Sequence, residues 1–273
     1  MSTTACDQVL EFYTDRCDES VRLTATLRGR LEAIRLRELL CPRLPEPPEP
    51  VADVGGGTGS HARWIRAAGH PVDLLDPVPR HVLAARRCGV RSAALGDARS
   101  LPWPDASYGL VLLAGPLYHL PPEERPHALA EAVRVARPGA VVAAVAVNRY
   151  ANLFGATIAN QLGERQQVVT DILATGYSPD NDRVPEMYYH SPAELTAEFL
   201  RAGLAEVEVH GLTGPGGWLA VAVDRHFPPG TPLPPTLGSP DPLATALAAA
   251  RTADRHPDLV TVSGQLLAVG LVR

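Results

Sequence analysis

A glycine-rich stretch that follows a short apolar segment constrains this chain more than any other feature. Residues 50–60 read Pro-Val-Ala-Asp-Val-Gly-Gly-Gly-Thr-Gly-Ser, and Val51, Ala52 and Val54 favour a short buried strand. Because glycine has no Cβ, the glycines let the backbone turn tightly and approach a ligand closely. The helix expected next points its unpaired N–H groups toward the same place. The stretch therefore predicts a binding site for a nucleotide-like ligand.

Short apolar segments alternate with amphipathic ones from residue 51 onward. This alternation is typical of a parallel sheet covered by helices on both faces. Strands are expected at 51–55, 72–76, 91–95, 108–114 and 140–147, and helices at 60–69, 79–88 and 122–136. A capped helix from Ser191 to about Ala202, a strand at 205–212, a helix at 242–253 and a closing strand at 266–272 complete the expected elements.

Three segments depart from this rhythm. Residues 1–49 have apolar positions at helical spacing, which predict an N-terminal helical segment closed by a proline-rich linker. Residues 149–189 read as an insertion with helical stretches, and we expect this insertion to form a cap over the carboxyl ends of the strands. Residues 213–240 are dense in glycine and proline and predict a long irregular loop. Residues 50–273 are expected to form one ligand-binding domain.

Composition and charge exclude several classes of function. A net charge of -5 and the lack of a basic stripe argue against a nucleic-acid partner. The longest apolar runs are shorter than the ~20 residues that a membrane span needs. The four cysteines are scattered without metal-ligand spacing, so we expect no metal site. No signal peptide is evident at the N-terminus, and we expect a cytoplasmic protein with reduced thiols.

Acidic residues stand at or near the ends of the first three expected strands. Asp53 precedes the glycines, Asp76 ends the second strand, and Asp97 follows Gly96 after the third strand. A carboxylate at the position of Asp76 can accept hydrogen bonds from both hydroxyls of a ribose. Asp97 is placed to accept from an exocyclic amine. An ordinary turn role remains open for Asp76 and Asp97.

The glycine pattern alone leaves two ligand classes open, since Gly57-x-Gly59-x-x-Ala62 also fits dinucleotide-binding proteins. The whole array is more specific: Asp53-Val-Gly55-Gly-Gly57-Thr-Gly59, Asp76, Gly96-Asp97 and Gly115-Pro-Leu-Tyr-His119-Leu. It resembles the class I S-adenosylmethionine-dependent methyltransferases over residues 50–150. The resemblance implies a Rossmann-like α/β fold with a seven-stranded, mostly parallel sheet and an antiparallel last strand, and S-adenosyl-L-methionine as cofactor.

The resemblance also implies roles for individual residues. The glycine turn would support the methionine part of the cofactor, Asp76 its ribose and Asp97 its adenine. The cofactor-binding residues expected on this basis are Asp53, Gly55, Gly57, Gly59, Asp76, Gly96, Asp97 and Ala114. Tyr13 and Arg30 are added as residues that can close over the methionine end, Arg30 by pairing with its carboxylate, although a surface-helix position is the simpler interpretation of both.

Candidate residues for the acceptor side are less determined. His119 is the best candidate for a base that removes a proton, or for a residue that orients the acceptor, because the family places the loop after strand four beside the reactive methyl. A loop-supporting role for His119 remains open. Tyr118, Tyr188, Tyr189 and His190 are candidates for the substrate pocket. Packing over the cofactor is the favoured role of Tyr118, and a fold-stabilising role fits each of the other three equally.

We therefore expect methyl transfer to an oxygen, nitrogen or carbon nucleophile of a small molecule, such as a specialised metabolite, or of a short peptide. One alternative is an NAD(P)-dependent oxidoreductase. A second alternative is a non-catalytic partner protein that binds the cofactor. The sequence does not determine the acceptor atom or the oligomeric state.

Overall fold

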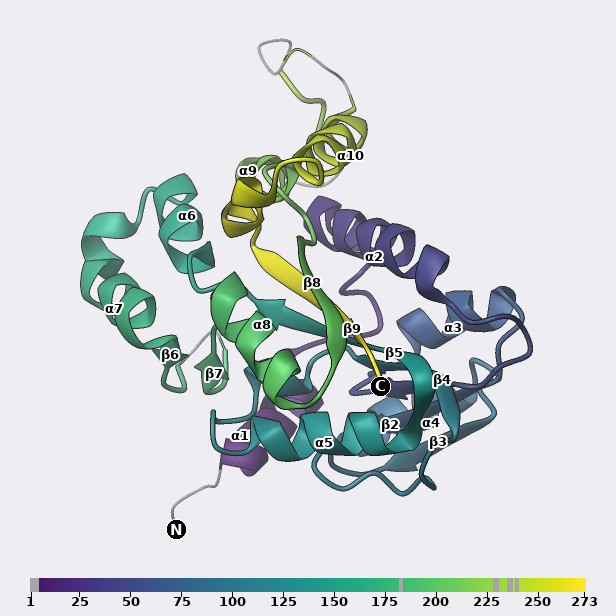
Figure 1. The fold of residues 1–273 in the computed structure, drawn as a ribbon. Helices are drawn as coiled ribbons and strands as arrows, with labels where there is room; N and C mark the ends of the chain where they lie inside the picture. Colours follow the sequence, from purple (N-terminus) through teal and green to yellow (C-terminus); the bar gives the residue numbers. More distant parts are fainter. Residues whose placement is uncertain (1–4, 182–183, 228–230, 235–237, 239–240) are drawn as a thin grey trace.

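A seven-stranded sheet forms the centre of the molecule (Figure 1). The computed structural model describes residues 5–181, 184–227, 231–234, 238 and 241–273. In this part of the chain the strands lie in the order β3-β2-β1-β4-β5-β9-β8. Their bounds are β1 (Val51–Val54), β2 (Val72–Asp76), β3 (Ser92–Leu95), β4 (Tyr108–Leu113), β5 (Ala136–Val147), β8 (Ala205–Gly211) and β9 (Gln265–Leu271). β1 to β5 pair in parallel, and β9 pairs antiparallel with β5 and β8. The predicted fold class is confirmed.

Helices bury both faces of the sheet, which explains why its central strands are apolar on both sides. In β4, Leu110 and Leu112 pack toward one face while Val111 and Leu113 pack toward the other. The first face is covered by α2 (Leu27–Leu40), α3 (Ser60–Ala67) and α4 (Pro79–Arg86). The second face is covered by α5 (Arg125–Val135) and α8 (Pro192–Arg201). Ser191 and Glu194 form the predicted capping box at the start of α8.

The remaining elements lie around this core. The chain begins with α1 (Ala5–Glu11), which continues as one π-helical turn over Phe12–Arg16. The expected insertion at 149–189 contains α6 (Ala151–Ile158), α7 (Leu162–Thr175) and the short pair β6 (Tyr177–Ser178) and β7 (Met187–Tyr188), which stand to one side of the sheet (Figure 1). The 3₁₀ turns are Cys41–Arg43, Pro116–Tyr118 and Pro257–Val262. Of the helices in the described ranges, none is long and apolar enough to span a bilayer.

The prediction of an irregular loop over residues 213–240 is wrong for its first half. Helix α9 (Gly216–His226) forms there and packs against α10 (Pro242–Ala253). A Cβ at Gly216 would lie 2.1 Å from the backbone oxygen of Ala246, so the two helices approach each other only because this residue is glycine. The glycine that suggested a loop therefore serves helix packing. Residues 228–230, 235–237 and 239–240 of the expected loop lie outside the described residues.

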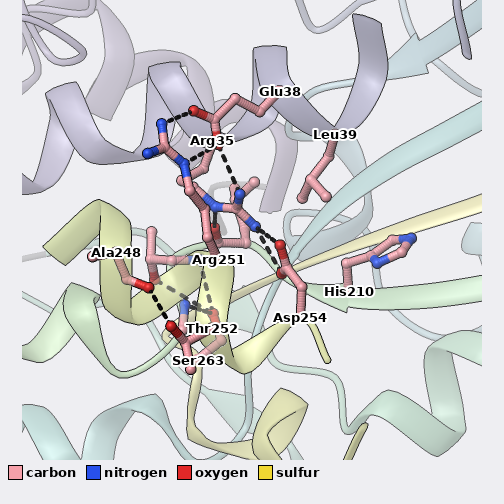
Figure 2. A network of polar contacts seen from close by, with 12 residues as sticks. Arg35, Glu38, Leu39, His210, Ala248, Arg251, Thr252, Asp254 and Ser263 are labelled. Atoms are coloured by element: carbon pink, nitrogen blue, oxygen red, sulfur yellow. Dashed lines mark hydrogen bonds and ion pairs between the residues drawn. The ribbon is translucent and has the colours of Figure 1, made fainter. Parts of the chain in front are cut away.

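A buried arginine ties α2 to α10 (Figure 2). The side chain of Arg35 is only 2% exposed, and its guanidinium donates to both carboxylate oxygens of Asp254 at 2.8 Å. It also donates to Glu38 at 2.8 Å and to the backbone oxygen of Leu212 at 3.3 Å. Arg251 reaches the same Glu38 from the exposed side. The N-terminal helical segment is thus fixed to the C-terminal part of the chain through one desolvated cation.

We expect Arg35→Ala to lower the free energy of unfolding by about 3 kcal/mol, because the change removes a buried side chain together with its packing and its hydrogen bonds to Asp254, Glu38 and Leu212. Arg251→Ala is the matched control: its side chain is 55% exposed, and its loss costs about 0.5 kcal/mol. Urea denaturation monitored by circular dichroism measures both values. Equal, small losses in the two variants would contradict the assigned role of Arg35.

Candidate active site

A cavity of about 470 Å³ lies at the carboxyl ends of the parallel strands. The turn after β1 contributes Gly55 and Gly57, β2 contributes Asp76, and Ala114 follows β4. Gly96 and Asp97 follow β3 and complete this part of the wall. Parallel strands end at one edge of a sheet, which is where ligands bind in open α/β folds. The structure thus brings most of the residues expected to bind the cofactor together around one space.

The glycine turn requires glycine for two separate reasons. Gly57 has a φ of 55°, in the left-handed region, and its N–H donates to Asp76 Oδ2 at 2.8 Å. At Gly55, also left-handed, an added Cβ would lie 2.9 Å from the ring of Pro116. The first constraint shapes the turn, and the second allows the loop after β4 to lie directly on the turn.

Asp76 joins three segments that meet below the cavity. Its Oδ2 accepts the hydrogen bond from Gly57, and its Oδ1 accepts the Val78 N–H at 2.9 Å. The ring nitrogen Nδ1 of His81 lies 3.0 Å from the same Oδ1. The carboxylate therefore fixes the glycine turn against the start of α4, and it lines the cavity at the same time.

Asp53 lies under the turn and does not line the cavity. The residue is fully buried, and neither carboxyl oxygen has a hydrogen-bond partner in the described part of the chain. Burial, followed by the negative charge of Asp76, raises the pKa of Asp53 to about 7. Asp53 is thus a buried carboxyl group that is largely protonated below neutral pH.

Asp97 is held by a neighbouring arginine. Arg99 donates through its backbone N–H at 2.8 Å and through Nε at 2.9 Å to Asp97 Oδ1. Partial burial alone would raise the pKa of Asp97, but the hydrogen bonds from Arg99 outweigh burial and hold this pKa below its ordinary value. Arg99 also lines the cavity and lies 3.4 Å from Glu124, so an ion-paired rim forms here.

The N-terminal segment closes one side of the cavity with Val9, Tyr13 and Glu19. Arg80 in the first turn of α4 holds this segment by donating to the backbone oxygens of Tyr13 and Cys17. The Tyr13 hydroxyl lies 3.0 Å from His119 Nε2, across 106 residues of sequence. The cavity wall therefore depends on the part of the chain that precedes the domain.

His119 is a weak base in this environment. Burial lowers its pKa to about 4, so the ring is neutral at pH 7 and can accept the hydrogen of Tyr13 at Nε2. The ring of Tyr118 packs edge-on against that of His119, with centroids 4.6 Å apart. Burial raises the pKa of Tyr118 to about 12, which keeps its hydroxyl protonated. His119 and Tyr118 both line the cavity, as expected.

Six of the expected residues do not line the cavity. Besides Asp53, Gly59 lies at the N-cap of α3, and Arg30 is exposed on α2, whose buried face is formed by residues such as Leu27 and Leu31. Arg22 lies closer to the cavity than Arg30 does, because it donates at 2.6 Å to Glu19, which lines the cavity.

Tyr188, Tyr189 and His190 lie where the insertion rejoins the sheet, outside the cavity lining. His190 is fully buried, its N–H donates to the backbone oxygen of Val147, and its Nε2 lies 3.2 Å from Glu198. The Tyr188 hydroxyl donates to Glu186 at 2.9 Å. These contacts fix the path of the chain, and the expected substrate role of these three residues finds no support in the cavity.

Sequence reasoning missed four polar lining residues: Glu19, His81, Arg99 and Glu124. Glu19 reaches the cavity through tertiary contacts that no local pattern reveals. His81 carried a usable signal, because it stands five residues after Asp76 in the first turn of the helix that begins with Pro79. A side chain in that turn points back toward the strand end.

A family model described as a methyltransferase domain matches residues 52–144, which include β1, its glycine turn and the strand ends around the cavity. Residues 52–144 thus match a methyltransferase domain. The identified resemblance is thereby confirmed. This methyltransferase domain has S-adenosyl-L-methionine as its cofactor, and the match disfavours the oxidoreductase alternative.

Individual relatives agree with this assignment. A malonyl-[acyl-carrier protein] O-methyltransferase of Serratia marcescens is 36% identical over 97 residues, which are 35% of this chain and 37% of that protein. The match thus spans little more than a third of the curated relative's length. An S-adenosylmethionine-dependent methyltransferase of Thermotoga maritima, titled a possible histamine N-methyltransferase, has a similar fold, with a TM-score of 0.60 at 17% identity over 99% of this chain and all of that one.

A geranyl diphosphate C-methyltransferase of Streptomyces coelicolor, solved with Mg²⁺, geranyl diphosphate and S-adenosyl-L-homocysteine, has a TM-score of 0.57 at 10% identity. The similarity covers 100% of this chain and 99% of that one. At this identity the similarity concerns the fold. Within the described residues of this chain, no group of three or more side chains is arranged to hold a metal ion.

The cavity fits the cofactor of this family. Its floor offers a carboxylate anchored by backbone and ring N–H groups, and its wall includes a turn where a Cβ would fill space. A volume of about 470 Å³ lies within the range of pockets that enclose small molecules. Asp76 would hold the ribose, Asp97 would face the adenine, and the glycine turn would support the methionine part.

We expect the free energy of unfolding of the parent protein to fall between pH 5 and pH 8. In Asp53→Asn this fall should be absent. The folded-state pKa of Asp53 is about 7, above its unfolded value, so its protonated form stabilises the fold at low pH and this contribution is lost as pH rises through 7. Urea denaturation at both pH values measures the effect. The exposed Asp258→Asn is the control, and an identical pH dependence in parent and Asp53→Asn would refute the assignment.

Proposed function

We propose that the chain transfers the methyl group of S-adenosylmethionine to a nucleophile of a small molecule or short peptide. The observation that carries this proposal is the Asp76 carboxylate, which is anchored by the glycine turn and by α4 at the floor of a cavity formed by four strand ends. The methyltransferase domain match over the same residues supports it.

The chain's own contribution is alignment and exclusion of water. The bound cofactor supplies an electrophilic methyl group. Val9, Leu120 and Pro121 give the cavity an apolar rim, and the aromatic rings of Tyr13 and Tyr118 flank His119. These side chains keep bulk water from the acceptor end. Burial in such a site strengthens the interactions of every polar group that remains.

His119 acts in this proposal by orienting Tyr13. A base of pKa about 4 removes protons poorly at neutral pH. With Nε2 occupied by the Tyr13 hydrogen, the ring fixes the hydroxyl, whose oxygen can still accept from an acceptor group. This arrangement suits nucleophiles that are reactive without a strong protein base, such as a carboxylate or a neutral amine.

The insertion at 149–189 is proposed to influence access of the acceptor from outside the cavity lining. Its β7 strand lies against the Pro116–Tyr118 turn, which carries Tyr118 into the cavity. Arg125 links the loop after β4 to β7. It donates to the backbone oxygen of Leu120 at 3.0 Å, and its guanidinium carbon lies over the Tyr188 ring, 5.4 Å from the ring centroid.

We expect the protein to bind S-adenosylhomocysteine in isothermal titration calorimetry and to show no comparable heat with NAD. Asp76→Asn is expected to weaken this binding at least about tenfold, because a charge-assisted acceptor at the cavity floor is lost. Asp258→Asn is the exposed control. Binding of NAD alone would instead support the oxidoreductase. Binding of S-adenosylhomocysteine without turnover across carboxylate, amine and carbon acceptors would support the non-catalytic alternative.

With an acceptor found in that panel, we expect His119→Ala to lower kcat about tenfold while leaving the shape of the kcat profile between pH 6 and pH 9 unchanged. The reason is that the His119 pKa of about 4 lies below this range, so its protonation state does not change there. Tyr13→Phe is the matched variant and should show the same loss. An inflection near pH 7 that disappears in His119→Ala would identify His119 as a general base instead.

A further inference from the structure

We propose that His81 binds the cofactor directly, with its ring nitrogen Nε2 accepting a hydrogen bond from one ribose hydroxyl. This inference rests on the proposed function, and it assigns to His81 a role that the sequence motifs do not. Three observations support this role: the position of the ring, the hydrogen-bonding capacity of Asp76, and the lack of a partner for Nε2 among the described residues.

The ring of His81 lies between the cofactor acid and the N-terminal segment. The residue is 3% exposed and lines the cavity. Its Nδ1 lies 3.0 Å from Asp76 Oδ1, and an ionised carboxylate only accepts, so Nδ1 carries the hydrogen. The Tyr13 ring packs edge-on against it with centroids 6.0 Å apart, which restricts rotation of the imidazole.

The other ring nitrogen has no protein partner. Nε2 of His81 is buried, and among the described residues nothing donates to it or accepts from it. Leaving a buried polar atom unpaired costs free energy, and such atoms in native structures call for an explanation. A ligand in the cavity that the same ring lines supplies the missing partner. With the hydrogen of the ring on Nδ1, Nε2 offers a lone pair to which a hydroxyl group can donate.

Counting acceptor sites on Asp76 points to the ribose. A carboxylate has about four lone-pair sites, two on each oxygen. Val78 and His81 occupy both sites on Oδ1, and Gly57 occupies one on Oδ2. One site is left for a ribose that has two adjacent hydroxyls. His81 Nε2 lies on the ring whose Nδ1 contacts Asp76 Oδ1, and it provides the second acceptor.

Three substitutions separate the functions of the two ring nitrogens. In His81→Asn the side-chain amide replaces Nδ1 and keeps the bond to Asp76, but nothing replaces Nε2. In His81→Gln the longer side chain carries its amide close to the position of Nε2. His70→Asn is the matched control, because His70 is equally buried, bonds the backbone oxygen of Glu49 through Nδ1 at 2.9 Å and lies at the opposite end of β2.

The measurement is the dissociation constant of S-adenosylhomocysteine, and of its 2′-deoxy and 3′-deoxy analogues, by isothermal titration calorimetry. Thermal unfolding of each variant confirms that it is folded. In the parent, loss of the hydroxyl that donates to Nε2 is expected to weaken binding about five- to tenfold. His81→Asn should weaken the binding of S-adenosylhomocysteine by the same factor. The variant should then bind S-adenosylhomocysteine no more tightly than the analogue that lacks this hydroxyl, as a double-mutant cycle requires. His81→Gln should recover most of the affinity, and His70→Asn should bind as the parent does.

Each opposite result overturns the inference. If His81→Asn binds S-adenosylhomocysteine as tightly as the parent, His81 serves only to hold Asp76. If it weakens all three ligands equally, Nε2 does not contact a ribose hydroxyl. These two outcomes leave the proposed function intact, because the parent still binds the cofactor product. A parent protein that binds none of the three ligands overturns the proposed function and this inference together.

Discussion

The hydrogen bonds of the Asp76 carboxylate are the interaction on which the candidate site depends. Through Gly57 they fix the end of the glycine turn, and through Val78 they fix the start of α4. Arg80 follows in α4 and holds the N-terminal segment by its backbone oxygens. A single acid at the end of β2 therefore positions three walls of the cavity, from segments that are distant in sequence.

The same place contains a second carboxyl group, and the two differ in how they are satisfied. Asp76 accepts three hydrogen bonds, whereas the fully buried Asp53 has no hydrogen-bond partner among the described residues. Two adjacent carboxylates without compensation do not both ionise easily. The negative charge is consequently concentrated on the acid that faces the cavity. Asp53 contributes a polar group beneath the turn whose burial is tolerated in its protonated form.

Regular elements and strand-end residues were predictable because they follow from local sequence patterns. The apolar strands, the Ser191 cap and the positions of Asp76 and Asp97 depend on periodicity and on the rule that parallel strands end together. Arg30 was not predictable, since its exposed position is set by which face of α2 packs on the core. The prediction of a loop around Gly216 was wrong for a related reason. Glycine is needed there for a close approach to Ala246, and the local sequence does not indicate such a helix–helix contact. Glu19 likewise reaches the cavity by tertiary contact alone.

In the proposed function, the wall that faces the acceptor combines the N-terminal segment with the loop after β4. Tyr13 meets His119 only because Arg80 holds the N-terminal segment over the strand ends. His119 is held neutral by burial, so this wall offers shape and a hydroxyl group but little proton affinity. Reactivity must then come from the cofactor and from the acceptor itself. In the proposed function, acceptors are consequently selected by their fit against Val9, Tyr13 and Leu120, while Asp76 and the glycine turn hold the cofactor.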